Sequence, residues 1–194
     1  MIQAVIFDCF GVLTSDAWLP FKRRYFGHDP NLEQQATDLN KQVDAGLADY
    51  DDFINGIAEL AGMQPTQARA EIANNVANEA LFEYMAQFLK PQYKIGLLSN
   101  AGANWLDELF GEKQAGLFDA VQLSCDTGFV KPDARAYHGV ADALGVAPEA
   151  CIFIDDQERY CTGARDVGMQ AVVYHEFEQC RDELEGLLGR SSPR

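Results

Sequence analysis

Polar residues follow four short apolar runs of this 194-residue chain, each at the point where the run ends. An ionised carboxylate at the end of a buried strand is costly unless it is paired or bound to a cation. The chemistry of these residues therefore depends on whether the fold brings them together. They are Asp8 after the first run, Ser99 and Asn100 at the second, Lys131 after the third, and Asp155 and Asp156 at the fourth.

These residue types complement one another chemically. Three carboxylates, from Asp8, Asp155 and Asp156, suit a hard cation such as Mg²⁺, which prefers oxygen ligands. A hydroxyl from Ser99, a helix N-terminus and the Lys131 ammonium would form a cradle for a phosphoryl group. Each feature alone also has an ordinary explanation as a helix cap or turn. Together they favour phosphoryl transfer to an aspartate.

The elements that position these residues are five predicted strands, over residues 3–7, 94–99, 120–124, 151–155 and 170–174. Their apolar residues are continuous rather than alternating, which is typical of parallel strands buried on both faces. Helical patterns over 104–110, 132–145 and 159–169 separate the last four strands. This alternation predicts a doubly wound α/β fold, in which ligands bind beyond the carboxyl ends of the strands.

The long segment between the first two strands has a different character. It contains no convincing strand and predicts helices over residues 32–43, 50–62, 66–77 and 79–90. We therefore expect a helical insert over residues 15–90, joined by linkers near 14–16 and 90–92, and a core made of residues 1–14 and 91–194.

Composition narrows the classes of partner. The formal charge of −15 repels nucleic acid and anionic membrane surfaces and so disfavours them as partners. A small anionic substrate could still bind where a lysine or a metal overrides that charge. No apolar run approaches the ~20 residues of a membrane span. The five scattered cysteines favour a reduced, cytoplasmic protein over a zinc site or a disulfide framework. Nothing in the sequence requires an oligomer.

Four segments of the chain resemble, in order and spacing, the motifs of the haloacid dehalogenase-like (HAD) hydrolase superfamily. They are "FDCFGVL" at Asp8, "LLSNA" at Ser99, "VKPD" at Lys131 and "FIDDQERYCTGARDVGM" at Asp155. The resemblance is to the branch with a helical cap inserted after the first strand. It implies a Rossmann-like core, a cap over residues 15–90, Mg²⁺ as cofactor and an aspartyl-phosphate intermediate. A Mg²⁺-dependent phosphatase of small phosphorylated metabolites is the activity we expect first.

The resemblance also implies a role for each matching residue. Asp8 would be the nucleophile, and Lys131 would orient it and neutralise charge. Ser99, Asn100 and Lys131 would bind the phosphoryl group. Mg²⁺ would be bound by Asp8, Asp156 and the backbone carbonyl of Phe10, with Asp155 on Lys131 or on a metal-bound water.

Phe10 departs from this pattern. Hydrolysing members of the superfamily usually carry a second aspartate at this position, which protonates the leaving group and activates water. A phenyl ring transfers no proton, and general acid–base catalysis typically contributes ~10²–10⁴-fold. Substitutes that the sequence offers are Asp16, His28 or the substrate itself. Tyr160 is a second departure, since relatives often have asparagine there.

These departures leave two alternative functions open. A metal-independent 2-haloacid dehalogenase would agree with an aromatic residue at position 10, but it has no use for the acidic pair 155–156. A catalytically impaired binding protein on the same fold would agree with both departures, but it does not require the remaining site residues. Substrate choice could involve the basic and aromatic segment 21–28, where Lys22, Arg23 or Arg24 could equally be solvated.

Overall fold

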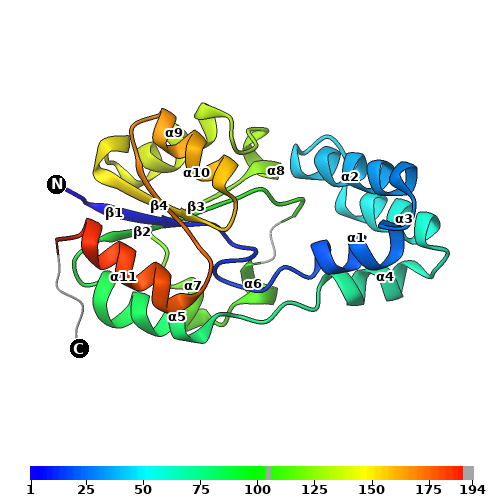
Figure 1. Cartoon of the computed structure of the whole chain (residues 1–194), viewed down its shortest axis with the longest axis horizontal. Helices are drawn as coiled ribbons and strands as arrows, with labels where there is room; N and C mark the ends of the chain where they lie inside the picture. The colour runs from blue at the N-terminus through cyan, green and yellow to red at the C-terminus, as the bar shows by residue number, and fades with distance from the viewer. Residues whose placement is uncertain (104–105, 190–194) are drawn as a thin grey trace.

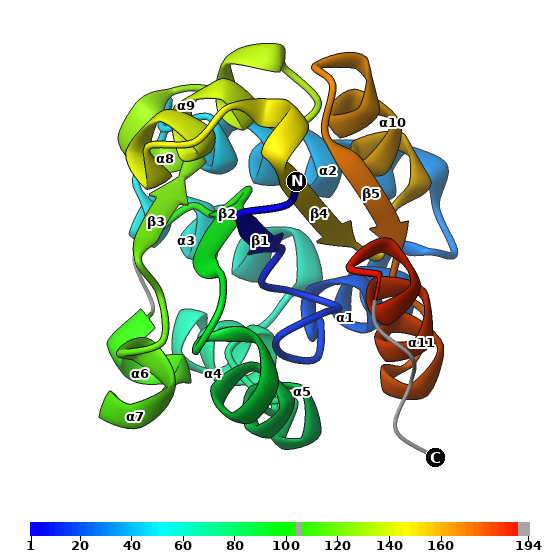
Figure 2. The same cartoon turned by 90° about the vertical axis from the view of Figure 1, so that its left-hand side faces the viewer.

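Across residues 1–103 and 106–189, which are the residues that the computed structural model describes, five parallel strands form one sheet. Figure 2 shows the strands in the order β3-β2-β1-β4-β5. The predicted doubly wound α/β fold is therefore confirmed. The strands are β1 Ala4–Phe7, β2 Lys94–Ser99, β3 Ala120–Leu123, β4 Cys151–Asp155 and β5 Gln170–Val173.

Helices cover both faces of the sheet, and a separate group lies beyond the carboxyl ends of the strands (Figure 1). Between β1 and β2 the chain forms α1 Trp18–Phe26, α2 Pro30–Asp44, α3 Tyr50–Ala61, α4 Pro65–Ile72, α5 Glu79–Tyr84 and the π-helix η1 Met85–Leu89. Later in the chain are α6 Leu106–Leu109, α7 Glu112–Ala115, α8 Ser124–Thr127, α9 Ala134–Leu144, the 3₁₀ helix η2 Pro148–Ala150, α10 Glu158–Asp166 and α11 Phe177–Leu187.

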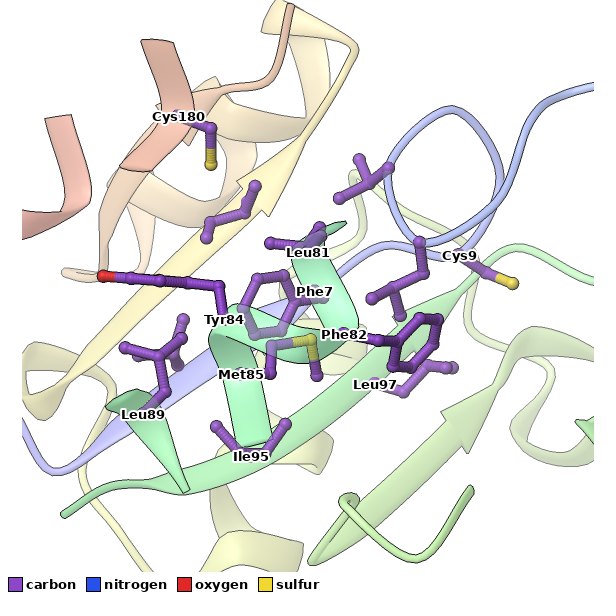
Figure 3. Close-up of a cluster of buried hydrophobic side chains, with 14 of the residues drawn as sticks. Phe7, Cys9, Leu81, Phe82, Tyr84, Met85, Leu89, Ile95, Leu97 and Cys180 are labelled. Atoms are coloured by element: carbon purple, nitrogen blue, oxygen red, sulfur yellow. The ribbon is translucent and has the colours of Figure 1, made fainter. Parts of the chain in front are cut away.

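Side chains alternate along each strand between two hydrophobic clusters. On β1, Val5 and Phe7 enter a cluster under α5 and α11, whereas Ala4 and Ile6 enter a cluster under α9 and α10. Figure 3 shows Phe7 among the side chains that α5 and η1 contribute to the first cluster. Because both faces of the strand are covered, both of its side-chain rows must be apolar, which explains the continuous apolar runs.

Helices α1 to α4 form a third cluster of their own, away from the sheet. We propose that these four helices constitute the cap. Their core contains Phe21, Phe26, Phe53, Ile54 and Ile57, which are all buried. Two of the three aromatic residues of the 21–28 segment, Phe21 and Phe26, thus lie inside the cap, and Tyr25 packs against this core half-buried.

The predicted boundary of the insert at residue 90 needs correction. Helix α5 and the π-helix η1 bury Leu81, Met85 and Leu89 against the sheet, not against α1 to α4. The second linker lies earlier in the chain than expected, beside the first linker near residues 14–16. The backbone N–H of Ser15 donates to the carbonyl of Val76, and the N–H of Asn78 donates to the carbonyl of Leu13, both at 2.9 Å. We therefore propose that the cap ends near residues 75–78.

Some elements differ from the sequence-based expectations. The helix expected over 66–77 ends at Ile72, and α8 and α11 had not been predicted. Asn104 and Trp105, at the start of a predicted helix, lie outside the described residues. Within the described chain, no helix combines the length and apolar composition that crossing a membrane requires.

Candidate active site

Strand β1 lies between β2 and β4, at the point where the strand order reverses. In open α/β sheets, ligands bind at the carboxyl ends of the strands at such a point. Asp8 directly follows β1, and its backbone N–H donates to the carbonyl of Ile154 on β4 at 2.8 Å. Ser99 ends β2 and Asp155 ends β4. The sheet itself therefore brings these three predicted residues together.

The Lys131 ammonium is buried between two carboxylates. Its Nζ lies 2.8 Å from Oδ1 of Asp8 and 2.6 Å from Oδ2 of Asp155, and its side chain is 1% exposed. The other oxygen of Asp155 accepts a hydrogen bond from the backbone N–H of Gln157 at 2.8 Å. Both oxygens of Asp155 are thus engaged, and the structure places this residue on Lys131, one of the two positions expected for it.

Asp156 provides the third carboxylate and has an unsatisfied oxygen. Oxygen atoms of Asp8, Asp155 and Asp156 lie within 4.8 Å of one another. Oδ1 of Asp156 is buried and lacks a hydrogen-bond partner, the one such side-chain atom in the part of the chain that the structure describes. Leaving a buried acceptor unsatisfied is costly. A hard cation such as Mg²⁺ would satisfy it, so the residues present fit a metal held by Asp8 and Asp156.

Gly11 makes room for the Asp156 carboxylate. Its φ of +86° lies in the left-handed region, which side chains rarely adopt. A Cβ at this position would lie 2.8 Å from both Cγ and Oδ2 of Asp156. The glycine of the first motif therefore has a steric function in the candidate metal site.

The acidic residues of the site outnumber its ammonium, and their pKa values reflect this. Burial raises the pKa of Asp8; the attraction of Lys131 opposes this rise only in part, and the charge of Asp155 adds to it. Burial, together with the charge of Asp155, raises the pKa of Asp156 to about 6. Burial alone would lower the pKa of Lys131, but the charges of Asp8 and Asp155 raise this pKa above its usual value. The site as a whole favours uptake of a cation or a proton.

The side chain of Asn100 binds the backbone of Lys131. Its Oδ1 accepts a hydrogen bond from the backbone N–H of Lys131 at 2.8 Å. Its Nδ2 donates to the carbonyl of Lys131 at 3.2 Å and to the Tyr160 hydroxyl at 3.4 Å. The side chain is occupied by these contacts, so we propose that it positions Lys131, and the expected phosphate contact of Asn100 stays a prediction.

The ring of Tyr160 lies next to the ammonium of Lys131. The Lys131 Nζ lies 5.0 Å from the centre of the Tyr160 ring, a distance at which a cation–π interaction is favourable. The Tyr160 hydroxyl accepts a hydrogen bond from Arg159, and its backbone carbonyl accepts one from the Tyr137 hydroxyl at 2.8 Å. Sequence analysis missed Tyr137, because its apolar spacing on a helix indicated only a core residue.

Phe10 presents an apolar surface beside the nucleophile. Its half-buried side chain packs on the cluster under α5 and α11. Cys9, its neighbour, supplies no reactive thiolate, because burial raises the pKa of the thiol. With Ser99, these residues line a small apolar pocket, whose other walls are Leu97, Ala101, Ala103, Leu106, Leu109, Phe110 and Leu123.

Neither of the two side chains that the sequence offered in place of the missing acid has contacts that favour this role. Oδ1 of Asp16 accepts hydrogen bonds from the backbone N–H groups of Trp18 at 2.8 Å and Leu19 at 3.3 Å, which is typical of a helix start. His28 is exposed on the cap. Of the three basic candidates, Arg23 and Arg24 are exposed, whereas Lys22 pairs with Glu33 at 3.6 Å.

Asp44, the last residue of α2, was not among the predicted site residues. Burial raises the pKa of its carboxyl to about 7, and the charge of Lys131 acts on it. The only signal in the sequence is its place at the end of an amphipathic helix, which does not show where the helix end lies in the fold.

We predict that Gly11→Ala will weaken Mg²⁺ binding by about 10–100-fold, the range seen when groups that orient metal ligands are changed. The added methyl group must displace the Asp156 carboxylate. Calorimetric titration with Mg²⁺ measures the affinity. Gly62→Ala is the matched control, because Gly62 has a φ of +66° but open space around it. Equal Mg²⁺ affinity in the two variants would contradict the steric function of Gly11.

We also predict that, in EDTA, the protein loses stability as the pH rises from about 5 to 8. The raised pKa values of Asp8, Asp156 and Asp44 mean that the folded state binds protons more tightly than the unfolded chain. Their contribution is therefore lost as pH rises through the folded-state values. Mg²⁺ replaces the protons, so its stabilising effect should grow over the same range.

Thermal unfolding at pH 5.5 and pH 8, with and without Mg²⁺, measures this effect; for a chain of this size, 1 kcal/mol corresponds to about 2–4 °C. Asp156→Asn is the control and should show a smaller pH dependence. A Mg²⁺ effect of the same size at both pH values would count against the prediction.

Known proteins resemble this chain in sequence and in fold. The family model of haloacid dehalogenase-like hydrolases matches residues 2–168. The chain is 27% identical to Phosphatase MT3486 of Mycobacterium tuberculosis over 211 residues, covering 93% of this chain and 91% of the relative.

Two solved structures share the fold. A HAD-family enzyme of Bacteroides thetaiotaomicron in complex with magnesium and inorganic phosphate has a TM-score of 0.73 at 23% identity, covering 90% of this chain and 95% of the other. The L-2-haloacid dehalogenase of Xanthobacter autotrophicus has a TM-score of 0.66 at 22% identity, covering 100% of this chain and 85% of the other. The motifs, the fold and the family match agree: this chain belongs to the haloacid dehalogenase-like hydrolases.

Proposed function

We propose that this hydrolase is a Mg²⁺-dependent phosphatase, which acts on a small phosphorylated metabolite through an aspartyl-phosphate at Asp8. The observation that carries the proposal is the buried acidic group, in which one ammonium faces three carboxylates and an Asp156 oxygen has no partner. The phosphatase that matches most of the chain, and the neighbour solved with magnesium and phosphate, support the same reading. We expect the reaction to be cytoplasmic.

In the first half of the reaction, a carboxylate oxygen of Asp8 attacks the phosphorus of the substrate. The bond between phosphorus and the leaving oxygen breaks, and that oxygen takes up a proton. Lys131 holds Asp8 in place, and the Ser99 hydroxyl donates a hydrogen bond to the transferring group. Mg²⁺, bound by Asp8, Asp156 and the carbonyl of Phe10, would neutralise phosphoryl charge.

In the second half, water attacks the phosphorus of the aspartyl-phosphate. The bond between phosphorus and the Asp8 oxygen breaks, so inorganic phosphate and free Asp8 are formed. The attacking water loses a proton in this step. Each half therefore needs a group that carries one proton, and the Phe10 side chain cannot do this.

We predict that Asp8→Asn abolishes Mg²⁺-dependent phosphate release from 4-nitrophenyl phosphate, lowering the rate by at least about 10³-fold. The amide that replaces the Asp8 carboxylate is not a nucleophile. The nitrophenol leaving group needs little proton transfer, so the lack of an acid at position 10 does not obscure the result. Release of nitrophenol with Mg²⁺ and with EDTA is the measurement. The control is Asp38→Asn, since Asp38 is an exposed cap residue that pairs with Lys41 at 3.6 Å. Turnover that persists in EDTA or in Asp8→Asn would refute the proposal.

A second prediction concerns position 10. Phe10→Asp supplies a carboxylate where the superfamily usually has one, so turnover of phenyl phosphate should rise, at most by the ~10²–10⁴-fold of general acid–base catalysis. The matched control is Phe10→Asn, which has the same shape but transfers no proton. If both variants change the rate equally, proton transfer at this position is not limiting.

The apolar pocket beside Ser99 and Phe10 favours a second candidate, a metal-independent 2-haloacid dehalogenase. In that reaction an Asp8 oxygen would bond to the substrate carbon as the carbon–halogen bond breaks and halide leaves. The unsatisfied Asp156 oxygen counts against it, because that chemistry needs no cation. Halide release from chloroacetate in EDTA, lost in Asp8→Asn, would favour this candidate. Absence of both activities would favour a binding protein.

A further inference from the structure

The cap brings one carboxylate to the active site, and that carboxylate belongs to Asp44 at the end of α2. Its neighbours in the chain touch the core on two sides. A Cβ at Gly102 would lie 2.5 Å from Cγ2 of Val43, and a Cβ at Gly46 would lie 2.8 Å from the carbonyl oxygen of Cys125. Gly102 belongs to the loop that follows Ser99. The end of α2 is therefore seated against the loop that follows Ser99 and against helix α8 (Figure 1).

The surroundings of Asp44 link it to the reacting residues. Two charged residues influence the pKa of the Asp44 carboxyl. Lys131, in the core, lowers this pKa, and Asp16, in the first linker, raises it. On its own helix, Asn40 donates a hydrogen bond from Nδ2 to Oδ2 of Asp44 at 2.8 Å. Oδ1 of Asp44 accepts no hydrogen bond from any described residue. One oxygen is thus anchored, and the other is available to carry a proton.

The protonation equilibrium of Asp44 suits proton transfer at neutral pH. Burial raises its pKa to about 7; Asn40 and Lys131 oppose the rise, and Asp16 adds to it. A carboxylate at a helix C-terminus is also disfavoured by the helix dipole. Both forms of the carboxyl are therefore populated near pH 7, where a general acid and base works best.

We propose that Asp44 is the general acid and base of this active site, in place of the aspartate that Phe10 replaces. Protonated Asp44 donates its proton to the leaving oxygen as the bond to phosphorus breaks. The resulting carboxylate then accepts a proton from the water that attacks the aspartyl-phosphate, which restores its starting state. This inference rests on the phosphatase activity proposed above.

Asp16 is the alternative on the same side of the site, and its contacts make it less suitable. Burial raises the pKa of Asp16 too, but two backbone N–H groups donate to its Oδ1 and oppose this rise. Asp44 accepts one hydrogen bond, which the side-chain amide of Asn40 donates to Oδ2.

The test compares two substrates in Asp44→Asn, at saturating Mg²⁺. Phenyl phosphate has a poor leaving group that needs a proton, whereas 4-nitrophenyl phosphate needs little help. We expect kcat/KM for phenyl phosphate to fall by about 10²–10⁴-fold, and for 4-nitrophenyl phosphate by less than about tenfold. With the latter, slow hydrolysis of the aspartyl-phosphate should produce a burst of nitrophenol. Asparagine keeps an oxygen acceptor for Asn40, so the helix end should remain folded.

The pH profile provides a readout that a structural defect would not change. In the wild type, kcat/KM for phenyl phosphate should decrease above about pH 7, because Asp44 loses the proton it donates. In Asp44→Asn this decrease should disappear. Asp38→Asn, on the same helix, is the matched control and should behave as the wild type.

Two results would overturn the role of Asp44. One is an equal loss on both substrates with an unchanged pH profile, and the other is a selective loss in Asp16→Asn but not in Asp44→Asn. Failure of the phosphatase proposal looks different: the wild type and Asp8→Asn would then release phosphate equally slowly from both substrates, and the role of Asp44 would fall with it.

Discussion

The buried ammonium of Lys131 is the interaction on which the rest of the active site depends. It lies 2.8 Å from Asp8 and 2.6 Å from Asp155, and the lysine side chain is 1% exposed. Removing one partner of such a buried pair typically costs about 3–5 kcal/mol, because the other charge is left uncompensated. One ammonium cannot neutralise three carboxylates, so the same arrangement that stabilises Asp8 creates the demand for a divalent cation at Asp156.

A lysine side chain is long and flexible, and its position here is fixed by contacts at both ends. The side chain of Asn100 forms hydrogen bonds with both the backbone N–H and the backbone carbonyl of Lys131. The ammonium lies 5.3 Å from the ring centre of Phe153 and 5.0 Å from that of Tyr160. Tyr160, a departure from the usual motif, thus contributes a ring surface that a smaller polar side chain would not provide.

The sequence was sufficient to predict the strands and the residues at their ends, since parallel strands buried on both faces have continuous apolar runs and their carboxyl ends meet at one edge. It was not sufficient for contacts made by loops and helix ends. The binding of Asn100 to the Lys131 backbone depends on how two loops approach each other. Likewise, the pattern of α2 predicts a helix, but only the packing of Val43 on Gly102 shows that the end of this helix, at Asp44, lies beside the site.

Moving the proton carrier from position 10 to the cap changes what controls the reaction. An aspartate at position 10 would lie on the same loop as the nucleophile, so its position would not depend on how α2 packs on the core. Asp44 is in place only while α2 rests on the core, because its position depends on the contacts of Val43 and Gly46. Proton transfer is then conditional on cap closure, and a substrate that the cap cannot enclose loses its proton donor as well as its binding contacts. Phosphate transfer and substrate selection would thereby depend on one conformational state, since both require the same helix end to be seated.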